Sequence, residues 1–161
     1  MPPLVAFVLC AGALHAGRAG AADVLPPHEA FALSARALDP TTLEARFNIV
    51  DGYYLYRDKL KFTVETPAPL ATTPQLPAGK MKHDEFFGDS ETYRGLLVVR
   101  LPLAAAEAGR TLTLVTESQG CADAGVCYPP QRQTLAVVVP AAGAGPGPFV
   151  LAPEGRPAWL K

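Results

Sequence analysis

Residues 42–65 read TLEARFNIVDGYYLYRDKLKFTVE, and this stretch decides the fold. In its first eight residues, apolar and polar side chains alternate strictly, which is the pattern of a half-buried β-strand. The apolar members are Leu43, Ala45, Phe47 and Ile49. Asp51 and Gly52 follow, a dipeptide that favours tight hairpin turns, and residues 60–64 then alternate again. The stretch therefore predicts a strand, a tight turn and a second strand.

Further short runs with β character lie along the chain, and Pro- and Gly-rich connections separate them. They cover residues 30–35, 95–103, 111–116 and 133–139. Six or seven short strands in about 120 residues, with turn signals between them, are typical of an antiparallel sandwich. The predicted fold is all-β, an immunoglobulin-like antiparallel β-sandwich.

The length and composition fit one globular domain with its own core. The chain has 161 residues, of which 49% are hydrophobic and 18% charged. Fourteen basic and fifteen acidic side chains leave a net charge of −1. Because nucleic acids and anionic membranes are recognised by basic surfaces, the sequence predicts no nucleic-acid partner and no attachment to a membrane surface.

Both ends of the chain differ from its middle. Residues 1–21 have the pattern of a secretory signal peptide, with an apolar run at residues 4–14 and an A-x-A pattern ending at Ala21. An apolar run of this length is too short to cross a bilayer as a helix. We therefore expect export to the periplasm, with residues 22–139 as the domain. Residues 140–161, rich in Pro and Gly and containing Trp159, are expected to be an extended tail or linker.

Removal of the signal peptide leaves two cysteines, Cys121 and Cys127, within the sequence GCADAGVCYPP. The β-like runs on either side place this segment at the tip of a hairpin. Opposed strand ends bring α-carbons to the separation of about 5.5 Å that a disulfide needs. In an oxidising compartment, such a pair is expected to be bonded at least part of the time.

Three roles are open to this cysteine pair. As a structural staple it closes a loop of about seven residues, which the chain-entropy model values at only about 2–2.5 kcal/mol. Metal binding is disfavoured, because structural zinc sites space their cysteines two to four residues apart and need two more ligands, for which only His28 and His83 remain. The staple and a redox pair stay open on these grounds. No C-x-x-C motif and no following helix are present to activate a thiol.

Two aromatic stretches stand out beside the cysteines. The sequence HDEFFGDSETYR, residues 83–94, places Phe86 and Phe87 next to Asp84 and Glu85 in a polar loop. Adjacent aromatic residues in an acidic loop either turn into the core or cover something on the surface. In YYLYR, residues 53–57, the alternation of a strand puts Tyr54 and Tyr56 on one face.

With these motifs together, the chain resembles a known family. The sequences DGYYLYRDKLKF, DEFFGDSETYRG and QGCADAGVCYPPQ, in this order, resemble the N-terminal periplasmic domain of the thiol:disulfide interchange protein DsbD over residues 24–139. The resemblance implies an immunoglobulin-like domain that acts as a protein-disulfide reductase component and uses a redox-active disulfide without another cofactor. It also implies a membrane electron-transfer module as donor. The implied acceptors are thioredoxin-like periplasmic proteins, among them disulfide isomerases and the thioredoxins of cytochrome c maturation.

The resemblance also implies roles for single residues. Cys121 and Cys127 match the redox pair, with Cys127 forming the mixed disulfide with a partner and Cys121 resolving it. Phe86 matches the side chain that shields the disulfide. The cap and lining positions are completed by Tyr54, Tyr56, Asp84, Glu85 and Phe87. A lid of this kind restricts access of other thiolates to an exposed disulfide.

Acidic side chains are expected to act on the thiols by their charge. Asp84, Glu85 and Asp123 would place negative charge near the sulfur atoms and, if close, disfavour the thiolate. Phe87 departs from the family, in which an aromatic residue with a hydroxyl is common at this position, so a cap hydrogen bond there is lost.

The membrane module and thioredoxin-like domain of the family do not follow before Lys161. We therefore expect either a truncated copy or a domain that works with a separate membrane partner. The rival interpretation is a non-catalytic periplasmic binding or assembly module on the same sandwich, with a structural disulfide. Replacement of Cys127 separates the two, because only a relay loses thiol exchange.

Overall fold

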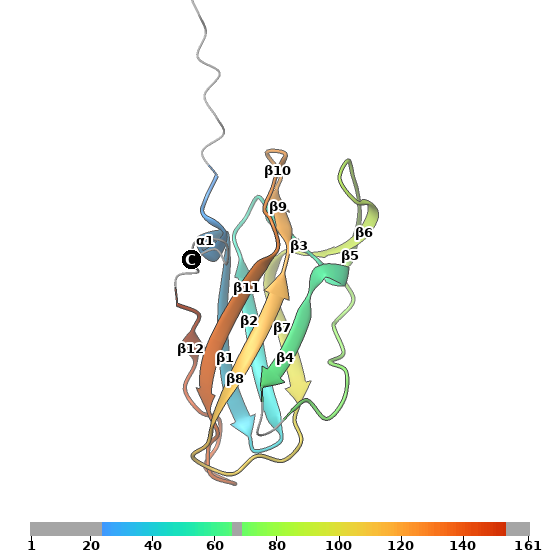
Figure 1. The fold of residues 1–161 in the computed structure, drawn as a ribbon. Helices are drawn as coiled ribbons and strands as arrows, with labels where there is room; N and C mark the ends of the chain where they lie inside the picture. The colour runs from blue at the N-terminus through green and yellow to red at the C-terminus, as the bar shows by residue number, and fades with distance from the viewer. Residues whose placement is uncertain (1–23, 66–68, 154–161) are drawn as a thin grey trace, which may run out of the picture.

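The computed structural model describes residues 24–65 and 69–153, and the chain folds there as a β-sandwich (Figure 1). The expected signal peptide and Trp159 lie outside the described residues. One layer is a four-stranded sheet in the order β12-β1-β2-β7. Its strands are β1 (Phe31–Asp39), β2 (Thr42–Ile49), β7 (Gly95–Pro102) and β12 (Val150–Leu151). The facing layer is a three-stranded sheet of β11 (Gln131–Val138), β8 (Thr111–Ser118) and β4 (Lys61–Glu65).

A third sheet, in the order β10-β9-β3-β6-β5, extends the sandwich at one end. Its strands are β3 (Tyr53–Tyr56), β5 (Lys80–Asp84), β6 (Gly88–Tyr93), β9 (Gly120–Ala122) and β10 (Val126–Cys127). Two short helices complete the described elements, α1 (Pro27–Ala30) and the 3-10 helix η1 (Arg57–Lys59). All pairings between strands are antiparallel, so the predicted all-β antiparallel sandwich is confirmed.

The core lies between the two main layers and follows the alternation of the strands. In β2 the four apolar residues of the predicted inward face are buried. They meet buried residues of β8 and β11, namely Leu112, Leu114, Leu135 and Val137. Full burial of one such side chain stabilises a fold by about 1.5–3 kcal/mol, so this apolar contact is the main source of stability.

The turn at Asp51 and Gly52 does not make the predicted hairpin. β2 pairs with β1 on one edge and β7 on the other, so no edge of β2 is left for the strand that follows. The chain instead turns with Gly52 at φ 86°, a conformation that glycine adopts without strain. It then enters the third sheet, where β3 pairs with β6 and β9.

The cysteine segment is the tip of a long hairpin, as predicted. β8 and β11 pair from Thr111 opposite Val138 to Ser118 opposite Gln131. Beyond them, β9 and β10 continue the same two chain segments and pair with each other. The sandwich therefore holds the cysteines at one end on a support of two paired strands.

Part of the expected tail packs on the sandwich. β12 pairs with β1, and the Gly147 N–H donates to the Ala37 carbonyl at 2.9 Å. The ring of Phe149 lies 4.3 Å from the Arg36 guanidinium and 4.4 Å from that of Arg46. The Pro- and Gly-rich composition predicts no strand here, whereas residues 150–151 pair with an edge of β1 and Phe149 packs against two cations.

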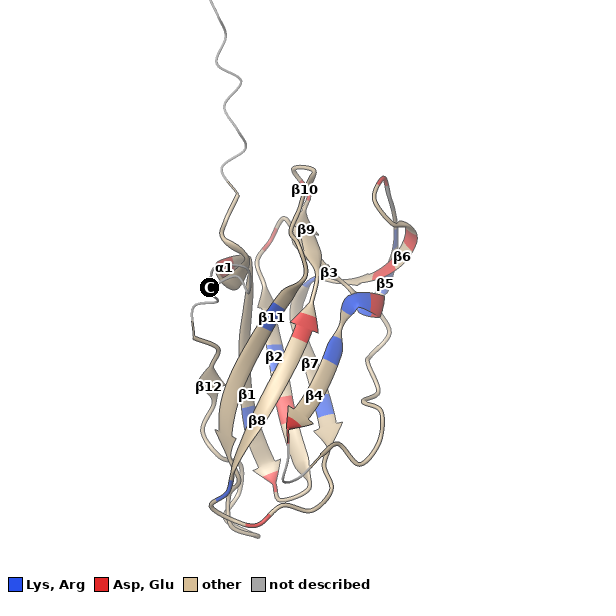
Figure 2. Cartoon of the chain, viewed as in Figure 1, with Lys and Arg blue, Asp and Glu red and all other residues tan. Residues whose placement is uncertain are grey.

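Charges of both signs are interspersed on the face shown in Figure 2. Glu117, near the end of β8, pairs with Lys61 at 3.3 Å and with Arg132 at 3.3 Å. None of the helices in the part of the chain that the structure describes has the length and apolar character that crossing a bilayer requires.

Candidate active site around the Cys121–Cys127 disulfide

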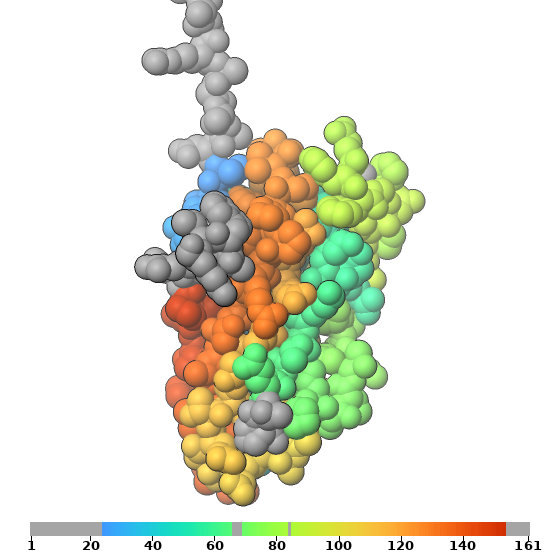
Figure 3. Space-filling view, in the orientation of Figure 1, coloured from blue at the N-terminus to red at the C-terminus, as the bar shows by residue number. Residues whose placement is uncertain are grey.

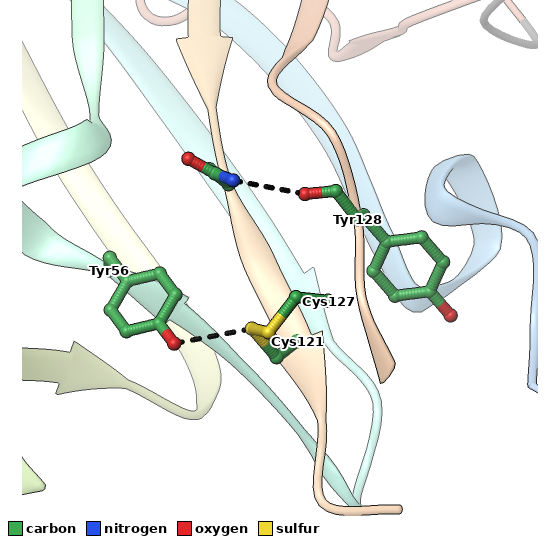
Figure 4. Close-up of a disulfide and its surroundings, with 5 residues drawn as sticks. Tyr56, Cys121, Cys127 and Tyr128 are labelled. Carbon is green, nitrogen blue, oxygen red and sulfur yellow. Dashed lines mark hydrogen bonds between the residues drawn. A yellow bond between two sulfur atoms is a disulfide. The ribbon is translucent and has the colours of Figure 1, made fainter. Parts of the chain in front are cut away.

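The two cysteines form a disulfide at the end of the long hairpin (Figure 4). Cys121 of β9 lies directly opposite Cys127 of β10, with the α-carbons 4.0 Å apart. β9 is an inner strand of its sheet, whereas β10 is the edge strand. Consequently, Cys121 is fully buried and Cys127 is only partly buried. A thiolate from outside meets Cys127 first.

Tyr56 contacts the buried sulfur. Its hydroxyl lies 3.2 Å from Cys121 Sγ, and because a disulfide sulfur carries no hydrogen, the tyrosine is the donor (Figure 4). The ring of Tyr54 lies 5.4 Å from that of Tyr56, which confirms that the two share a face. Both rings are buried. The β3 strand brings them to the disulfide because Tyr54 pairs with Cys121 in the sheet.

Close packing of β9 on β3 depends on Gly120. A Cβ at this position would lie 2.3 Å from the Tyr54 carbonyl oxygen and 2.7 Å from Cζ of Phe31. Atoms at such distances clash, so only glycine lets the strand before Cys121 lie flat against its neighbour. The residue is therefore part of what positions the disulfide.

On the other side of the hairpin, Tyr128 fixes the backbone that follows Cys127. Its ring points away from the disulfide (Figure 4), packs 5.5 Å from Phe31, and its hydroxyl donates to the Leu25 carbonyl at 2.6 Å. Burial raises the pKa of Tyr128 to about 12. The Gln119 side-chain amide donates to the Tyr128 carbonyl at 3.1 Å. Tyr128 thus packs in the core, as expected, with its ring turned away from the disulfide (Figure 4).

The predicted polar loop at residues 83–94 is largely a hairpin, which we call the cap hairpin (residues 80–93). β5 and β6 pair throughout it, and His83 lies opposite Asp89 with 2.6 Å between Nδ1 and Oδ1. Gly88 has φ 65°, which allows the chain to reverse. The cap hairpin and the cysteine hairpin rise at the same end of the molecule (Figures 1 and 3).

The tip of the cap hairpin reaches the disulfide site through Phe87. Its ring lies 4.8 Å from the Tyr56 ring in an edge-to-face arrangement, and the Lys59 ammonium lies 4.9 Å from its centre. Phe86 is 55% exposed, and Glu85 is also exposed. The role of Phe86 as the shield of the disulfide stays a prediction, whereas Phe87, which has no hydroxyl, makes the packing contact expected of its ring.

The charge near the cysteine turn differs from the expectation. Asp123 is not an unpaired anion, because both of its carboxylate oxygens accept hydrogen bonds from Arg94, at 2.8 and 2.6 Å. These bonds hold the pKa of the Asp123 carboxyl below its usual range. Two cations flank the Tyr54 ring, Lys82 at 4.8 Å and Arg94 at 5.0 Å. The negative charge of Asp123 is therefore paired with Arg94, and its effect on the thiols stays a prediction.

Sequence reasoning assigned no role at this site to three basic residues around it, Lys59, Lys82 and Arg94. Each lies on a different segment, and their spacing along the chain does not indicate that they meet. No group of three metal-ligating side chains occurs among residues 24–65 and 69–153. The arrangement supports thiol–disulfide exchange at a disulfide whose Cys127 is partly exposed and whose Cys121 is buried.

Comparisons with known proteins agree with this chemistry. A sequence model of the family described as "Thiol:disulfide interchange protein DsbD, N-terminal" matches residues 21–139. The chain is 46% identical over 126 residues to the thiol:disulfide interchange protein DsbD of Ralstonia nicotianae, covering 77% of this chain and 20% of that protein. It is 38% identical over 155 residues to DsbD of Escherichia coli, covering 94% and 26%. The chain thus spans only about a fifth to a quarter of these relatives.

Solved structures give the same result. The N-terminal domain of DsbD from Neisseria meningitidis in the reduced form is 35% identical, with a TM-score of 0.66 over 82% of this chain and 97% of that one. A complex between the DsbD N-terminal and PilB N-terminal domains of that organism matches at 36% identity and a TM-score of 0.56, over 71% of this chain and 87% of that one. The chain belongs to the family of the N-terminal domain of the thiol:disulfide interchange protein DsbD.

Proposed function

We propose that this domain passes electrons in the periplasm from a membrane reductant to thioredoxin-like proteins through the Cys121–Cys127 pair. The observation that carries the proposal is the asymmetry of the disulfide. Cys121 is fully buried beside the Tyr56 hydroxyl, whereas Cys127 lies partly exposed on an edge strand. A purely structural staple needs no such difference between its two sulfur atoms.

The asymmetry supports a different role for each cysteine. When the domain is oxidised, a donor thiolate attacks Cys127 Sγ, the bond to Cys121 breaks, and its electron pair leaves on Cys121 Sγ. The Tyr56 hydroxyl, 3.2 Å away, donates a hydrogen bond to that developing thiolate. The second donor thiol then attacks the mixed disulfide and releases the Cys127 thiolate. Two electrons and two protons have then moved to the domain, and the donor carries the disulfide.

Electrons pass from the reduced domain to an acceptor by the same steps in reverse. The Cys127 thiolate attacks one sulfur of the acceptor disulfide and forms a mixed disulfide, and the other acceptor sulfur leaves as a thiolate. Cys121 then attacks Cys127 Sγ, which restores the disulfide and releases the acceptor as a dithiol. Burial of Cys121 suits this role, because a resolving thiol has to reach only its neighbour.

The cap hairpin would control access to Cys127. Phe87 already packs against Tyr56, and Lys59 of η1 lies against the Phe87 ring. With Phe86 as the shield, a partner has to displace the tip of the hairpin before its thiolate reaches the sulfur. Glu85 at the tip would add negative charge that restrains thiolate formation. The domain would then select its partners by which of them can displace the cap hairpin and reach Cys127.

Trapping the mixed disulfide tests these roles directly. The Cys121→Ala variant is reduced and incubated with a thioredoxin-like acceptor that keeps only the first cysteine of its C-x-x-C motif, activated as a mixed disulfide with thionitrobenzoate, and the products are analysed by mass without reductant. We expect a covalent complex through Cys127 with release of thionitrobenzoate, because neither protein then has a second thiol to resolve it. The Cys127→Ala variant should form none. Equal trapping by the two variants would contradict the assignment, and no trapping by either would favour the binding module with a structural disulfide.

A further inference from the structure

The turn between the two cysteines is held from outside the cysteine hairpin. Asp123 accepts two hydrogen bonds from the Arg94 guanidinium, at 2.8 and 2.6 Å. Its backbone N–H donates to the Gly52 carbonyl at 2.7 Å. A planar guanidinium that meets a planar carboxylate through two bonds fixes orientation as well as distance. The turn is therefore anchored at two points to other segments.

Arg94 is itself firmly placed. It lies between the last residue of β6 and the first residue of β7, and its guanidinium also donates to the Tyr53 carbonyl at 3.3 Å. Its charged group lies 5.0 Å from the centre of the Tyr54 ring. Tyr54 pairs with Cys121 in the β3–β9 ladder. Arg94 thus connects the backbone beside the buried cysteine with the turn that leads to the exposed one.

The cap hairpin takes part in the same cluster. Lys82 of β5 lies 4.8 Å from the Tyr54 ring, and its charge also acts on Asp123. Few other contacts support the turn: the Gly125 N–H donates to the Ala122 carbonyl at 3.0 Å, β9 has three residues and β10 two, and residues 123–126 are exposed. When the disulfide is open, the contacts of Asp123 are therefore a large share of what orders the turn.

We propose that the Arg94–Asp123 pair is a clamp that positions the turn between the cysteines and makes the disulfide harder to reduce. This inference rests on the proposed function, since the potential of the pair matters only if the pair exchanges. In the assay reaction, the disulfide takes up two electrons and two protons from two glutathione molecules, which join as glutathione disulfide. A turn that stays ordered after reduction keeps the two thiols close, and their high effective concentration favours closure.

Arg94 and Asp123 are positioning residues in this scheme, because they act through the turn and not on a sulfur atom. An ordinary surface ion pair would stabilise the oxidised and reduced proteins equally and would leave the potential unchanged. The reduction potential of the disulfide therefore distinguishes a clamp from a merely structural ion pair. A stability measurement on the oxidised protein alone does not make this distinction.

The test is glutathione equilibration of four proteins, with free thiols counted by mass: the wild type, Asp123→Asn, Arg94→Met and the double variant. We expect the equilibrium constant for reduction to rise about fivefold in each single variant, which is about 20 mV at about 29.6 mV per tenfold. The double variant should rise no further than the larger single effect, because both substitutions break the same contact. Asp123→Asn keeps the shape of an exposed side chain and so tests the clamp even if Arg94→Met folds poorly.

Arg110→Met is the matched control. It removes another exposed arginine that pairs with an acidic residue, Glu107, at 3.6 Å, outside the cysteine end of the sandwich. Its potential should equal that of the wild type. If the reduction potentials of Asp123→Asn and Arg94→Met also equal that of the wild type, the clamp is overturned and the proposed function stays intact. A wild-type disulfide that glutathione cannot reduce at any ratio would instead contradict the proposed function.

Discussion

The hydroxyl of Tyr56 is the group through which the fold acts on the buried sulfur, so Tyr56→Phe is the sharpest perturbation of the chemistry. The substitution removes the oxygen that lies 3.2 Å from Cys121 Sγ. It keeps the ring, whose centre is 5.4 Å from that of Tyr54 and 4.8 Å from that of Phe87. The cap and the packing around the disulfide should therefore stay in place.

The size of the effect follows from the charge that develops at Cys121. In the resting disulfide, the sulfur is a weak neutral acceptor, whereas during exchange it becomes a thiolate. A hydrogen bond to a charged group contributes about 1.5–3 kcal/mol, and one between neutral groups about 0.5–1.5 kcal/mol. The difference, about 1–1.5 kcal/mol, appears in the barrier. We expect reduction of the disulfide to slow by about five- to thirteenfold, with a loss of unfolding free energy below about 1 kcal/mol.

The assay is reduction of the oxidised domain by a small dithiol, quenched with acid at intervals, with free thiols counted by mass. The matched control is Tyr53→Phe, which also deletes a buried tyrosine hydroxyl but one that accepts a hydrogen bond from the Leu25 N–H at 2.8 Å. Its rate should equal that of the wild type. A Tyr56→Phe rate within twofold of the wild type, or an equal slowing in Tyr53→Phe, would refute the assigned role.

Three further outcomes are expected. Gly120→Ala should lower the unfolding free energy by about 2–3 kcal/mol in urea, because its Cβ would lie 2.3 Å from the Tyr54 carbonyl oxygen; unchanged stability would contradict the close packing of β9. Phe149→Ala should lower it by about 1–2 kcal/mol and speed amide exchange at residues 150–152, because two cation–π contacts are lost; exchange as slow as in the wild type would refute the attachment of this segment. Asp123 has a pKa held low by Arg94, so its contribution to stability is present above about pH 4 and lost as the pH falls through the lower folded-state value. Urea midpoints of the wild type and Asp123→Asn should therefore converge below pH 4, and a constant difference down to about pH 2.5 would contradict this.

Local periodicity was enough to predict most of the sandwich. The alternation of residues 42–49 specifies both a strand and its buried face, because side chains of a strand point to opposite sides in turn. It does not specify partners. Asp51 and Gly52 form a turn, but whether a turn joins paired strands depends on which edges are free, and β2 has none. The attachment of Phe149 was missed for a similar reason, since its partners come from a different part of the chain.

The candidate site was predictable where the residues form compact motifs. The cysteine pair, the two tyrosines and the aromatic tip of the cap hairpin each occur within a few neighbouring residues, and the structure brings Tyr54, Tyr56 and Phe87 to the disulfide end. The Arg94–Asp123 pair joins residues 29 positions apart, and nothing in either local sequence indicates that the two meet. Long-range ion pairs of this kind follow from strand order, which composition and spacing do not determine.

The central claim is that the Cys121–Cys127 pair exchanges electrons and is not a staple. Its most direct test is the reduction potential of the wild-type domain, residues 22–161, equilibrated in glutathione buffers with free thiols counted by mass. The account predicts a value in the range of exchanging oxidoreductases, roughly −180 to −270 mV. A potential far below about −300 mV, where structural disulfides lie, would contradict it.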